Sequence, residues 1–423
     1  MPEESQQSIK LYPYRWVILA VAFTVSASLY YGTYTVPGMS VMLMTDYGFS
    51  PVEFSIIATM PYLSGFVFCI PSGVWADRRG IRQVVVIGMV LALCGTVLRC
   101  ISTSFIVLLI GSFLMGFALA ALNANSAKLI GMWFSGRNTS AAMGLYVSGA
   151  NVGVAVALFT GPFFKVAETG FLVSAVIVLI TTVIWFIFGK NHPCGESQAA
   201  EEPIMTHLQT VIKSKNAWVL SLFMFFLFGS SITRQTFVNS AFAELSGSAI
   251  TAGVVSSYST MVIAISCIVL PMFVARMKNL KPIMIIVGFL NAFLIGSVLL
   301  FGFGVQTWIL MGIQSSCIGV LLPSGKTLPT LMPDLETKHL GAVGGLQAMF
   351  QNMGAWLVPA YVVVPICTAA FGGSSISIFV ASGIFSVFCA LTMAFLPETG
   401  TSIAAKQERE AARKQQETQA PAD

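Results

Sequence analysis

Charged residues are scarce in this sequence: only 9% of its 423 residues are Asp, Glu, Lys or Arg, whereas 56% are hydrophobic. Ordinary soluble proteins carry about 25% charged residues. The shortage excludes an ordinary soluble protein and indicates an integral membrane protein. The apolar runs are continuous and show no alternation of apolar and polar residues. Strands of a membrane β-barrel alternate in this way over about ten residues each, so a barrel is excluded. The predicted fold class is therefore all-α.

Residues typical of metal sites and of catalysis are scarce as well. The three histidines, His192, His207 and His339, all fall in predicted loops, and the eight cysteines form no CxxC pair and lie mostly inside apolar runs. The cysteines are expected to be small core residues. No Ser-His-Asp set and no phosphate-binding loop is present. We predict no enzyme activity, no metal and no cofactor, and the net charge of +5 is explained by membrane topology rather than by nucleic-acid binding.

Acidic residues are missing from the middle of the apolar runs, since all 17 fall in loops, termini or ends of runs. A proton relay through the membrane would need carboxylates or imidazoles there. Their absence disfavours proton coupling through side chains. It leaves exchange, facilitated diffusion, or cotransport in which the substrate carries the proton.

What the sequence has in abundance is long apolar runs. A membrane core of roughly 30 Å needs about 20 apolar residues per helix, and twelve such spans can be drawn. They cover residues 16–40, 53–76, 84–103, 105–133, 139–164, 170–189, 216–243, 250–275, 282–303, 306–332, 340–366 and 375–396. We therefore predict a multi-pass protein whose immediate surroundings are the lipid bilayer.

Basic residues are distributed unevenly between the two faces of the membrane. With the N-terminus in the cytoplasm, eighteen Lys and Arg fall on or near the cytoplasmic side, and only Arg99 and Lys165 lie near the outer face. This bias is the positive-inside pattern. It predicts a cell membrane protein, in the plasma or inner membrane, with both termini cytoplasmic.

The chain divides into two parts of six spans each. Residues 190–215 interrupt the hydropathy with Pro, Gly, His and Glu and carry apolar residues at helical spacing, which predicts a cytoplasmic linker with a short surface helix. We expect an N-terminal half at 1–189, a C-terminal half at 216–400 and a polar cytoplasmic tail at 401–423. An offset of 201 residues pairs several residues of the two halves, including Gly153 with Gly354, and indicates a duplication.

One charged stretch, Gly73-Val74-Trp75-Ala76-Asp77-Arg78-Arg79-Gly80-Ile81-Arg82, separates the second and third spans. We expect its charges to lie in the turn that joins these spans. The pattern resembles the loop signature of the major facilitator superfamily, a large family of secondary transporters. The resemblance implies the twelve-helix fold of that family, in two six-helix pseudo-repeats that work by alternating access, with the substrate site near the middle of the membrane. It also implies that Gly73, Asp77, Arg78, Gly80 and Arg82 stabilise one conformational state.

A finer resemblance lies in the fourth and fifth spans. The segment from Lys128 to Gly153 is similar to branches of the superfamily that carry small organic or inorganic anions. Ser112 stands where many members have an Arg after Gly, so a role ascribed to that Arg cannot be transferred to this chain.

Two basic residues fall inside predicted spans. Arg234 lies in the seventh span, about 27 Å from its cytoplasmic start, and Lys326 follows Pro323-Ser324-Gly325 in the tenth span, towards the cytoplasm. A charge inside a membrane costs at least about 2.5–3.5 kcal/mol, so such residues are candidate functional sites. Each could instead extend its long side chain to the membrane surface. Basic charge without acidic partners favours an anionic substrate, because the substrate supplies the missing counter-charge.

Polar residues on spans one and four are further candidates. The offset of 201 residues places Asn125 opposite Lys326, and Asn123 is its near neighbour. The resemblance implies that spans one, four, seven and ten line the cavity. Tyr34 shares a helical face with Tyr30, although an aromatic belt at the membrane surface is an equal alternative. We expect Asn125 and Tyr34 to be polar partners in the substrate site.

These observations predict a transporter, expected to be monomeric, that moves a small anionic molecule, a carboxylate or an oxyanion, by exchange, uniport or substrate-linked cotransport. Arg234 and Lys326 are its predicted anion contacts. One alternative is an exporter of neutral or amphipathic metabolites or drugs. Another is a sensor or assembly partner that transports nothing.

Overall fold

The structure is a computed structural model of the chain, and it describes residues 13–134, 137–191, 211–274, 277, 279–298, 302–332, 335 and 340–398. The polar tail and nearly all of the predicted surface helix of the linker lie outside these residues. The chain divides into two compact units, unit 1 at residues 1–201 and unit 2 at residues 202–423. Each unit is described by itself.

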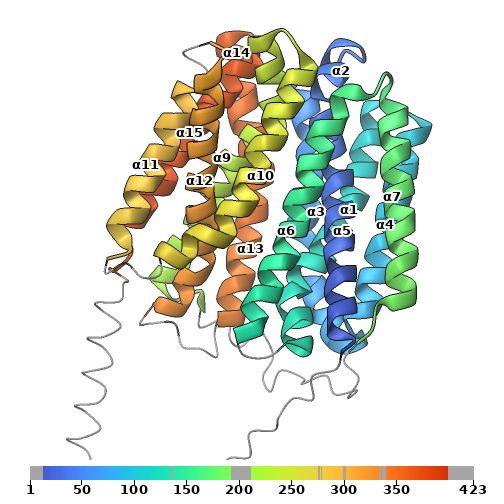
Figure 1. Cartoon of the computed structure of the whole chain (residues 1–423), viewed down its shortest axis with the longest axis vertical. Helices are drawn as coiled ribbons and strands as arrows, with labels where there is room; N and C mark the ends of the chain where they lie inside the picture. Colours follow the sequence, from blue (N-terminus) through green and yellow to red (C-terminus); the bar gives the residue numbers. More distant parts are fainter. Residues whose placement is uncertain are drawn as a thin grey trace, which may run out of the picture. The chain divides into compact units, whose positions relative to one another are not determined.

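Among its described residues, unit 1 contains six long helices, a short helix and a 3₁₀ turn. They are α1 (Arg15–Gly38), α2 (Ser40–Thr45), α3 (Pro51–Arg79), α4 (Ile81–Ile101), α5 (Phe105–Trp133), α6 (Arg137–Thr160), the turn η1 (Gly161–Phe163) and α7 (Ala167–Phe188). Within the unit, α1 packs against α6 and α7, and α5 packs against α3 and α4 (Figure 1).

Among its described residues, unit 2 has six long helices in the same order and one short helix. The long helices are α9 (Lys215–Ser246), α10 (Ala249–Val274), α11 (Lys281–Ser297), α12 (Val305–Thr327), α13 (Leu340–Leu357) and α15 (Ser375–Ala394), and the short helix is α14 (Val364–Phe371). A 3₁₀ turn, Leu328–Leu331, follows α12, and a π-helical turn, Val358–Val363, joins α13 to α14. Here α9 packs against α13 and α15, and α10 packs against α12.

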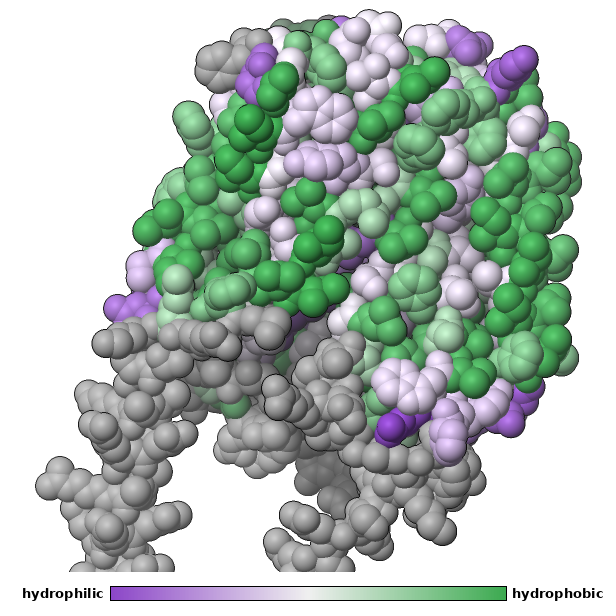
Figure 2. Space-filling view, viewed as in Figure 1, coloured by the Kyte–Doolittle hydropathy of each residue, from purple (hydrophilic) through white to green (hydrophobic). Residues whose placement is uncertain are grey.

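Each of the twelve predicted spans is matched by a helix, which confirms the all-α membrane fold. Among the described residues, eleven helices are long and apolar enough to cross a membrane, and α11, at 17 residues, is a shorter apolar helix. Large apolar side chains lie exposed along several of them, for example Phe186 on α7 and Phe293 on α11. Figure 2 shows hydrophobic atoms covering most of the described surface over α7. A lipid environment accounts for this exposure.

The junction between α3 and α4 differs from the prediction. We expected Asp77, Arg78, Arg79 and Arg82 in a turn, but α3 continues to Arg79 and α4 begins at Ile81, so the junction is Gly80 alone. Gly80 has φ +84°, a backbone conformation that favours glycine. The charges therefore lie in the last turn of α3 and the first turn of α4, because one glycine suffices to reverse the chain.

The offset of 201 residues corresponds to one repeated packing contact. A Cβ atom on Gly153 of α6 would clash with the carbonyl of Ala27 on α1, and a Cβ atom on Gly354 of α13 would clash with the carbonyl of Phe225 on α9. Small residues allow helix backbones to approach this closely in membranes. In both units a glycine thus allows the same close contact between the first and the fifth long helix.

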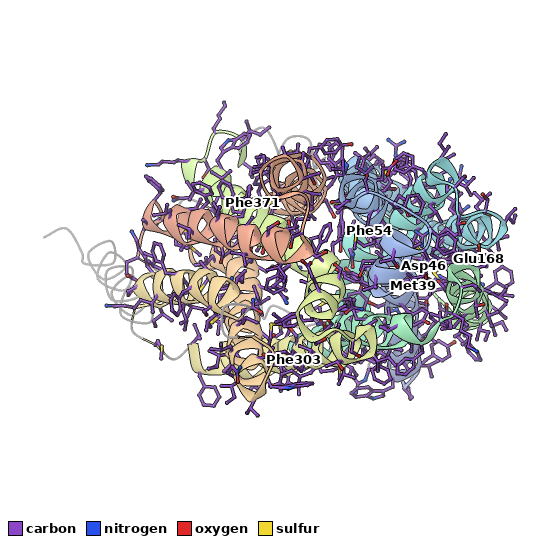
Figure 3. The ribbon with its side chains drawn as sticks, turned by 90° about the horizontal axis from the view of Figure 1, so that it is seen from above. Met39, Asp46, Phe54, Glu168, Phe303 and Phe371 are labelled. Atoms are coloured by element: carbon purple, nitrogen blue, oxygen red, sulfur yellow. The ribbon has the colours of Figure 1, made fainter. Side chains whose placement is uncertain are left out.

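At the end of unit 1 remote from Gly80, a tyrosine links the α2–α3 connection to α7. The Tyr47 hydroxyl donates to Glu168 at 2.7 Å and accepts from the Ala167 N–H at 3.1 Å. Figure 3, seen from above, labels Glu168 and Asp46, the residue before Tyr47, near each other in unit 1. Burial, and next the hydrogen bond to Glu168, raise the pKa of the Tyr47 phenol.

Candidate functional site

Lys326 lies near the end of α12 with an exposed side chain. The adjacent Gly325 carbonyl accepts a bond from Gln347 Nε2 at 3.3 Å, and Gly325 packs against Phe223. Pro323 lies inside α12, which nevertheless continues to Thr327. Cys267 of α10 lies within electrostatic range of the ammonium. Among the described residues no carboxylate pairs with Lys326.

Arg234 lies on α9 and is almost fully buried, with 1% of its surface exposed. Its Nη1 donates to Ser259 Oγ of α10 at 3.4 Å, and Ser259 shares a hydrogen bond of 2.7 Å with Ser315 of α12. The side chain therefore points into the helix packing of unit 2 and not towards the lipid. Arg234 connects α9, through two serines, to α10 and α12.

The structure does not bring the two predicted anion contacts together. Arg234 reaches α12 at Ser315, and Lys326 lies eleven residues further along that helix. At 1.5 Å per residue the two levels are about 16 Å apart along the axis. The two long side chains would therefore have to extend towards each other for one small carboxylate or oxyanion to contact both.

The predicted polar partners, Tyr34 and Asn125, lie in unit 1 and are both buried. Tyr34 Oη shares a hydrogen bond of 2.9 Å with Tyr62 Oη of α3. Asn125 Nδ2 donates to the Ala121 carbonyl of its own helix at 2.8 Å. Tyr34 thus links α1 to α3, whereas the Asn125 amide is turned towards its own backbone.

Of the predicted gating residues, Arg78 is exposed at the end of α3. Asp77 lies in the same helical turn, but its side chain lies outside the described part of the structure. A Cβ atom on Gly73 would meet no described atom within 4 Å, whereas one on Gly80 would lie 2.5 Å from Asn191 Nδ2. Glycine at position 80 is favoured by its φ of +84° rather than by packing, because the Asn191 side chain could move aside, and no close contact requires glycine at position 73.

Arg82 links the start of α4 to the end of α7. Its backbone N–H donates to Asn191 Oδ1 at 3.0 Å, and its Nη2 donates to the Phe186 carbonyl at 2.8 Å. The Trp185 Nε1–H donates to the Arg82 carbonyl at 3.3 Å. A cation at a helix C-terminus also interacts favourably with the helix dipole. We call this contact between α4 and α7 the Arg82 clasp.

Unit 2 has a corresponding contact between α11 and α15, which we call the Lys281 clasp. Lys281 Nζ donates to the carbonyls of Ala394 and Leu396 at 2.7 and 2.8 Å. Glu398 Oε1 accepts from the backbone N–H groups of Leu280 and Lys281 at 2.8 and 3.0 Å. In each unit a basic residue at the start of one helix thus caps the end of another. In this respect Lys281 of unit 2 corresponds to Arg82 of unit 1.

Sequence reasoning placed Arg99 near the outer face, but it is fully buried within unit 1. Its Nη1 donates to the Gly32 carbonyl of α1 at 2.9 Å, and its Nη2 donates to Ser112 Oγ of α5 at 2.9 Å. The guanidinium also lies 5.9 Å from the ring centre of Phe171 on α7. The sequence feature that could have indicated this burial is the pair Gly95 and Gly111, because these glycines bring α4 and α5 into contact beside Arg99.

Sequence reasoning also missed a polar cluster formed by Tyr30, Asn123 and Tyr146, which we call the Asn123 cluster. Asn123 Nδ2 donates to Tyr30 Oη at 3.1 Å, and Tyr146 Oη donates to Asn123 Oδ1 at 3.2 Å. The residues come from α5, α1 and α6. Tyr146 is buried, while Asn123 is exposed. The cluster combines donors, acceptors and two aromatic rings without formal charge.

No group of three or more His, Cys, Asp or Glu that could hold a metal ion occurs in the part of the chain that the structure describes. The described acidic residues Glu53, Glu168 and Glu244 lie near helix ends, and Glu398 follows α15. Glu53 forms a capping box with Ser50 at the start of α3. Its carboxylate is therefore used for local structure.

Comparisons with known proteins agree with this architecture. A bacterial homolog to the human lysosomal transporter Spinster, solved in an inward-facing and unoccupied conformation, superposes with a TM-score of 0.70 and 14% identity, over 90% of this chain and 96% of that one. A point mutant of the nucleoside transporter NupG gives a TM-score of 0.73 and 15% identity, over 90% and 99% of the two chains. The comparison with curated proteins found no match.

A family model gives the assignment. The model described as Major Facilitator Superfamily matches residues 20–359, which is most of the chain. The charged stretch at Gly73 to Arg82, the two units of six long helices and the similar solved structures agree with that match. The chain belongs to the Major Facilitator Superfamily of transporters.

Proposed function

We propose that this transporter moves a small anion, a carboxylate or an oxyanion, by alternating access, and that Lys326 is the first contact for the negative charge. The observation that carries the proposal is an exposed ammonium on a membrane-spanning helix with no carboxylate partner among the described residues. A charge at such a position is costly unless it is solvated or paired. An anionic substrate supplies the pair while it is bound.

Arg234 has a second role in this proposal. It contributes positive potential inside unit 2, and its bond to Ser259 connects α9 to α10. Because Lys326 lies about 16 Å away along α12, we expect the same small anion to contact Arg234 in another step of the cycle. Loss of Arg234 should therefore block turnover rather than the first binding event.

The proposed coupling mode is supported by where the described carboxylates lie. The described acidic residues are near helix ends, where Glu53, Glu168 and Glu244 bond to helix starts or to a connecting segment. A proton relay through side chains would need titratable groups in the middle of the helices. We propose exchange, uniport or cotransport in which the substrate carries its own proton. Tyr34 and Asn125 remain proposed polar partners of the cargo, and monomeric function in the cell membrane with cytoplasmic termini remains part of the proposal.

The Asn123 cluster favours a second candidate function, transport of a neutral polar solute. Its two phenols and one amide are uncharged hydrogen-bonding groups. A protein of similar fold, NupG, is a nucleoside transporter, although at 15% identity the likeness shows the fold alone. An exporter of neutral or amphipathic metabolites would use such a surface without needing Lys326.

One experiment separates the two candidates. Purified protein in liposomes is tested for uptake of labelled acetate, lactate, succinate, nitrate and uridine, each in competition with the others. The anion proposal predicts uptake of at least one anion, and loss of that uptake in Lys326→Ala. Uptake of uridine that Lys326→Ala leaves unchanged, with no anion transported, would favour the neutral-solute function.

A further inference from the structure

The Asn123 cluster of unit 1 has hydrogen-bonding capacity that its internal bonds do not use. Asn123 carries two N–H donors and one carbonyl oxygen with two lone pairs. One N–H goes to Tyr30 and one lone pair to Tyr146. The remaining N–H and lone pair lie on a side chain that is exposed. One donor and one acceptor are thus presented side by side.

The two tyrosines hold the Asn123 amide in place. Tyr146 donates its O–H to Asn123 Oδ1, and Asn123 Nδ2 donates to Tyr30 Oη, so both ends of the amide are bonded to other helices. The Tyr30 hydroxyl accepts from Asn123, which leaves its own proton as a second donor in the cluster. A pre-oriented amide loses less freedom when it binds a ligand than a mobile one does.

The exposure of Asn123 is not that of a lipid-facing residue. The exposed apolar residues of α5, Ile106 and Ile110, lie roughly 100–140° away from Asn123 around the helix axis. Asn123 faces Tyr30 of α1 and Tyr146 of α6 instead. An amide with unused hydrogen-bonding groups is poorly suited to hydrocarbon. The position fits a surface that meets water or a polar ligand.

The chemistry of the cluster selects one kind of group. A ligand hydroxyl both donates and accepts, and so matches an amide that offers one N–H and one lone pair. A carboxylate accepts only, and it would be repelled by the amide oxygen. The neighbouring pair Tyr34 and Tyr62 adds further neutral hydroxyls on α1 and α3. The cluster therefore recognises a neutral hydroxyl group, while negative charge is recognised elsewhere.

We propose that the Asn123 cluster binds a hydroxyl group of the cargo, so that the transporter selects hydroxylated small carboxylates over their analogues without the hydroxyl. This inference rests on the proposed anion transport and names the substrate class. Sites built to hydrogen-bond a substrate hydroxyl reject analogues lacking it, because their own polar groups are then left unpaired.

The test compares pairs of anions that differ by one hydroxyl, lactate with propionate and malate with succinate, in liposomes containing the purified protein. The wild-type protein should prefer the hydroxylated member of at least one pair by roughly tenfold or more. Asn123→Leu should reduce this ratio to within about twofold by weakening the hydroxylated member only. Tyr30→Phe and Tyr146→Phe should give intermediate ratios, because each removes one group that orients the amide.

Two control variants separate a loss of hydroxyl recognition from a general loss of transport. Thr182→Val removes a hydroxyl that bonds only within α7, to the Val178 carbonyl, and should leave the ratio unchanged. Lys326→Arg, which keeps the positive charge and is expected to retain part of the uptake, should weaken both members of a pair alike. Transport of anions without any preference for the hydroxyl, or a preference that survives Asn123→Leu, would overturn this inference and leave anion transport intact. Transport of no anion at all would overturn both.

Discussion

Arg99 Nη2 lies 2.9 Å from Ser112 Oγ, so a guanidinium from α4 contacts the position on α5 where many members of the superfamily carry an arginine of their own. Both residues have 0% of their surface exposed. A second bond, to the Gly32 carbonyl, connects the same guanidinium to α1. A buried cation thus holds three helices of unit 1 together, although α5 itself has serine at this position.

Arg99→Ala should destabilise the protein. The substitution removes two charge-assisted hydrogen bonds and leaves a cavity, for an expected loss of about 2–4 kcal/mol and a fall in Tm of roughly 2–5 °C. Thermal unfolding in detergent measures it. Ser112→Ala should cost less, since the bond to Gly32 remains. An unchanged Tm in Arg99→Ala would contradict the role of Arg99 in holding these helices together.

The Lys281 clasp predicts that Glu398 contributes to the stability of the folded protein. Glu398→Ala removes the acceptor of two N–H groups at the start of α11 and should cost about 1 kcal/mol, as loss of a helix cap does. Glu398→Gln keeps an oxygen acceptor and is the matched control, with an expected loss less than half as large. Chemical or thermal unfolding of the two variants, side by side, gives the difference. Equal losses would show that the carboxylate does not act as a cap.

Tyr47 predicts a pH dependence of stability. Its pKa is raised in the folded protein, so the folded state holds the phenol proton more tightly than the unfolded state. The resulting stabilisation is fully present below the unfolded pKa of about 10 and is lost as pH rises through the folded pKa. The wild-type protein should therefore be more stable than Tyr47→Phe by about 1–2 kcal/mol at neutral pH. The difference in stability between the wild-type protein and Tyr47→Phe should become smaller above pH 10. Unfolding of both proteins at several pH values measures this difference. A difference that stays constant above pH 10 would contradict the role of the Tyr47 phenol.

Arg234→Ala should abolish transport while membrane abundance stays near normal. The reason is that the variant loses a buried cation joined through Ser259 to α10 and α12, which the transport cycle is proposed to use. Arg234→Lys is the matched variant, because it keeps the charge and loses the planar guanidinium. Uptake and membrane abundance are measured together. Normal uptake by Arg234→Ala would remove Arg234 from the transport site.

The sequence was sufficient to predict the spans, because a membrane core demands long apolar runs whatever the function. The start of α3 was also predictable, since Ser50, Pro51 and Glu53 act locally. Local rules failed at the charged stretch, where only the geometry shows that Gly80 alone reverses the chain.

The candidate site was predictable in part. Lys326 and Arg234 could be singled out by their position in apolar runs, but their separation along α12 depends on how the helices pack. Arg99 was missed because a basic residue near the end of a span usually reaches the membrane surface, and its burial needs α1 and α5 beside it. Asn123 gains its partners from two other helices, and no local pattern reveals that arrangement.

The most direct test of anion transport is the flux of labelled anions into liposomes that contain purified wild-type protein or the Lys326→Ala or Lys326→Arg variant. We predict saturable uptake by the wild-type protein, inhibited by other small carboxylates or oxyanions. Uptake should be abolished in Lys326→Ala and partly retained in Lys326→Arg, which keeps the charge. Anion uptake by Lys326→Ala at the wild-type rate would contradict the account.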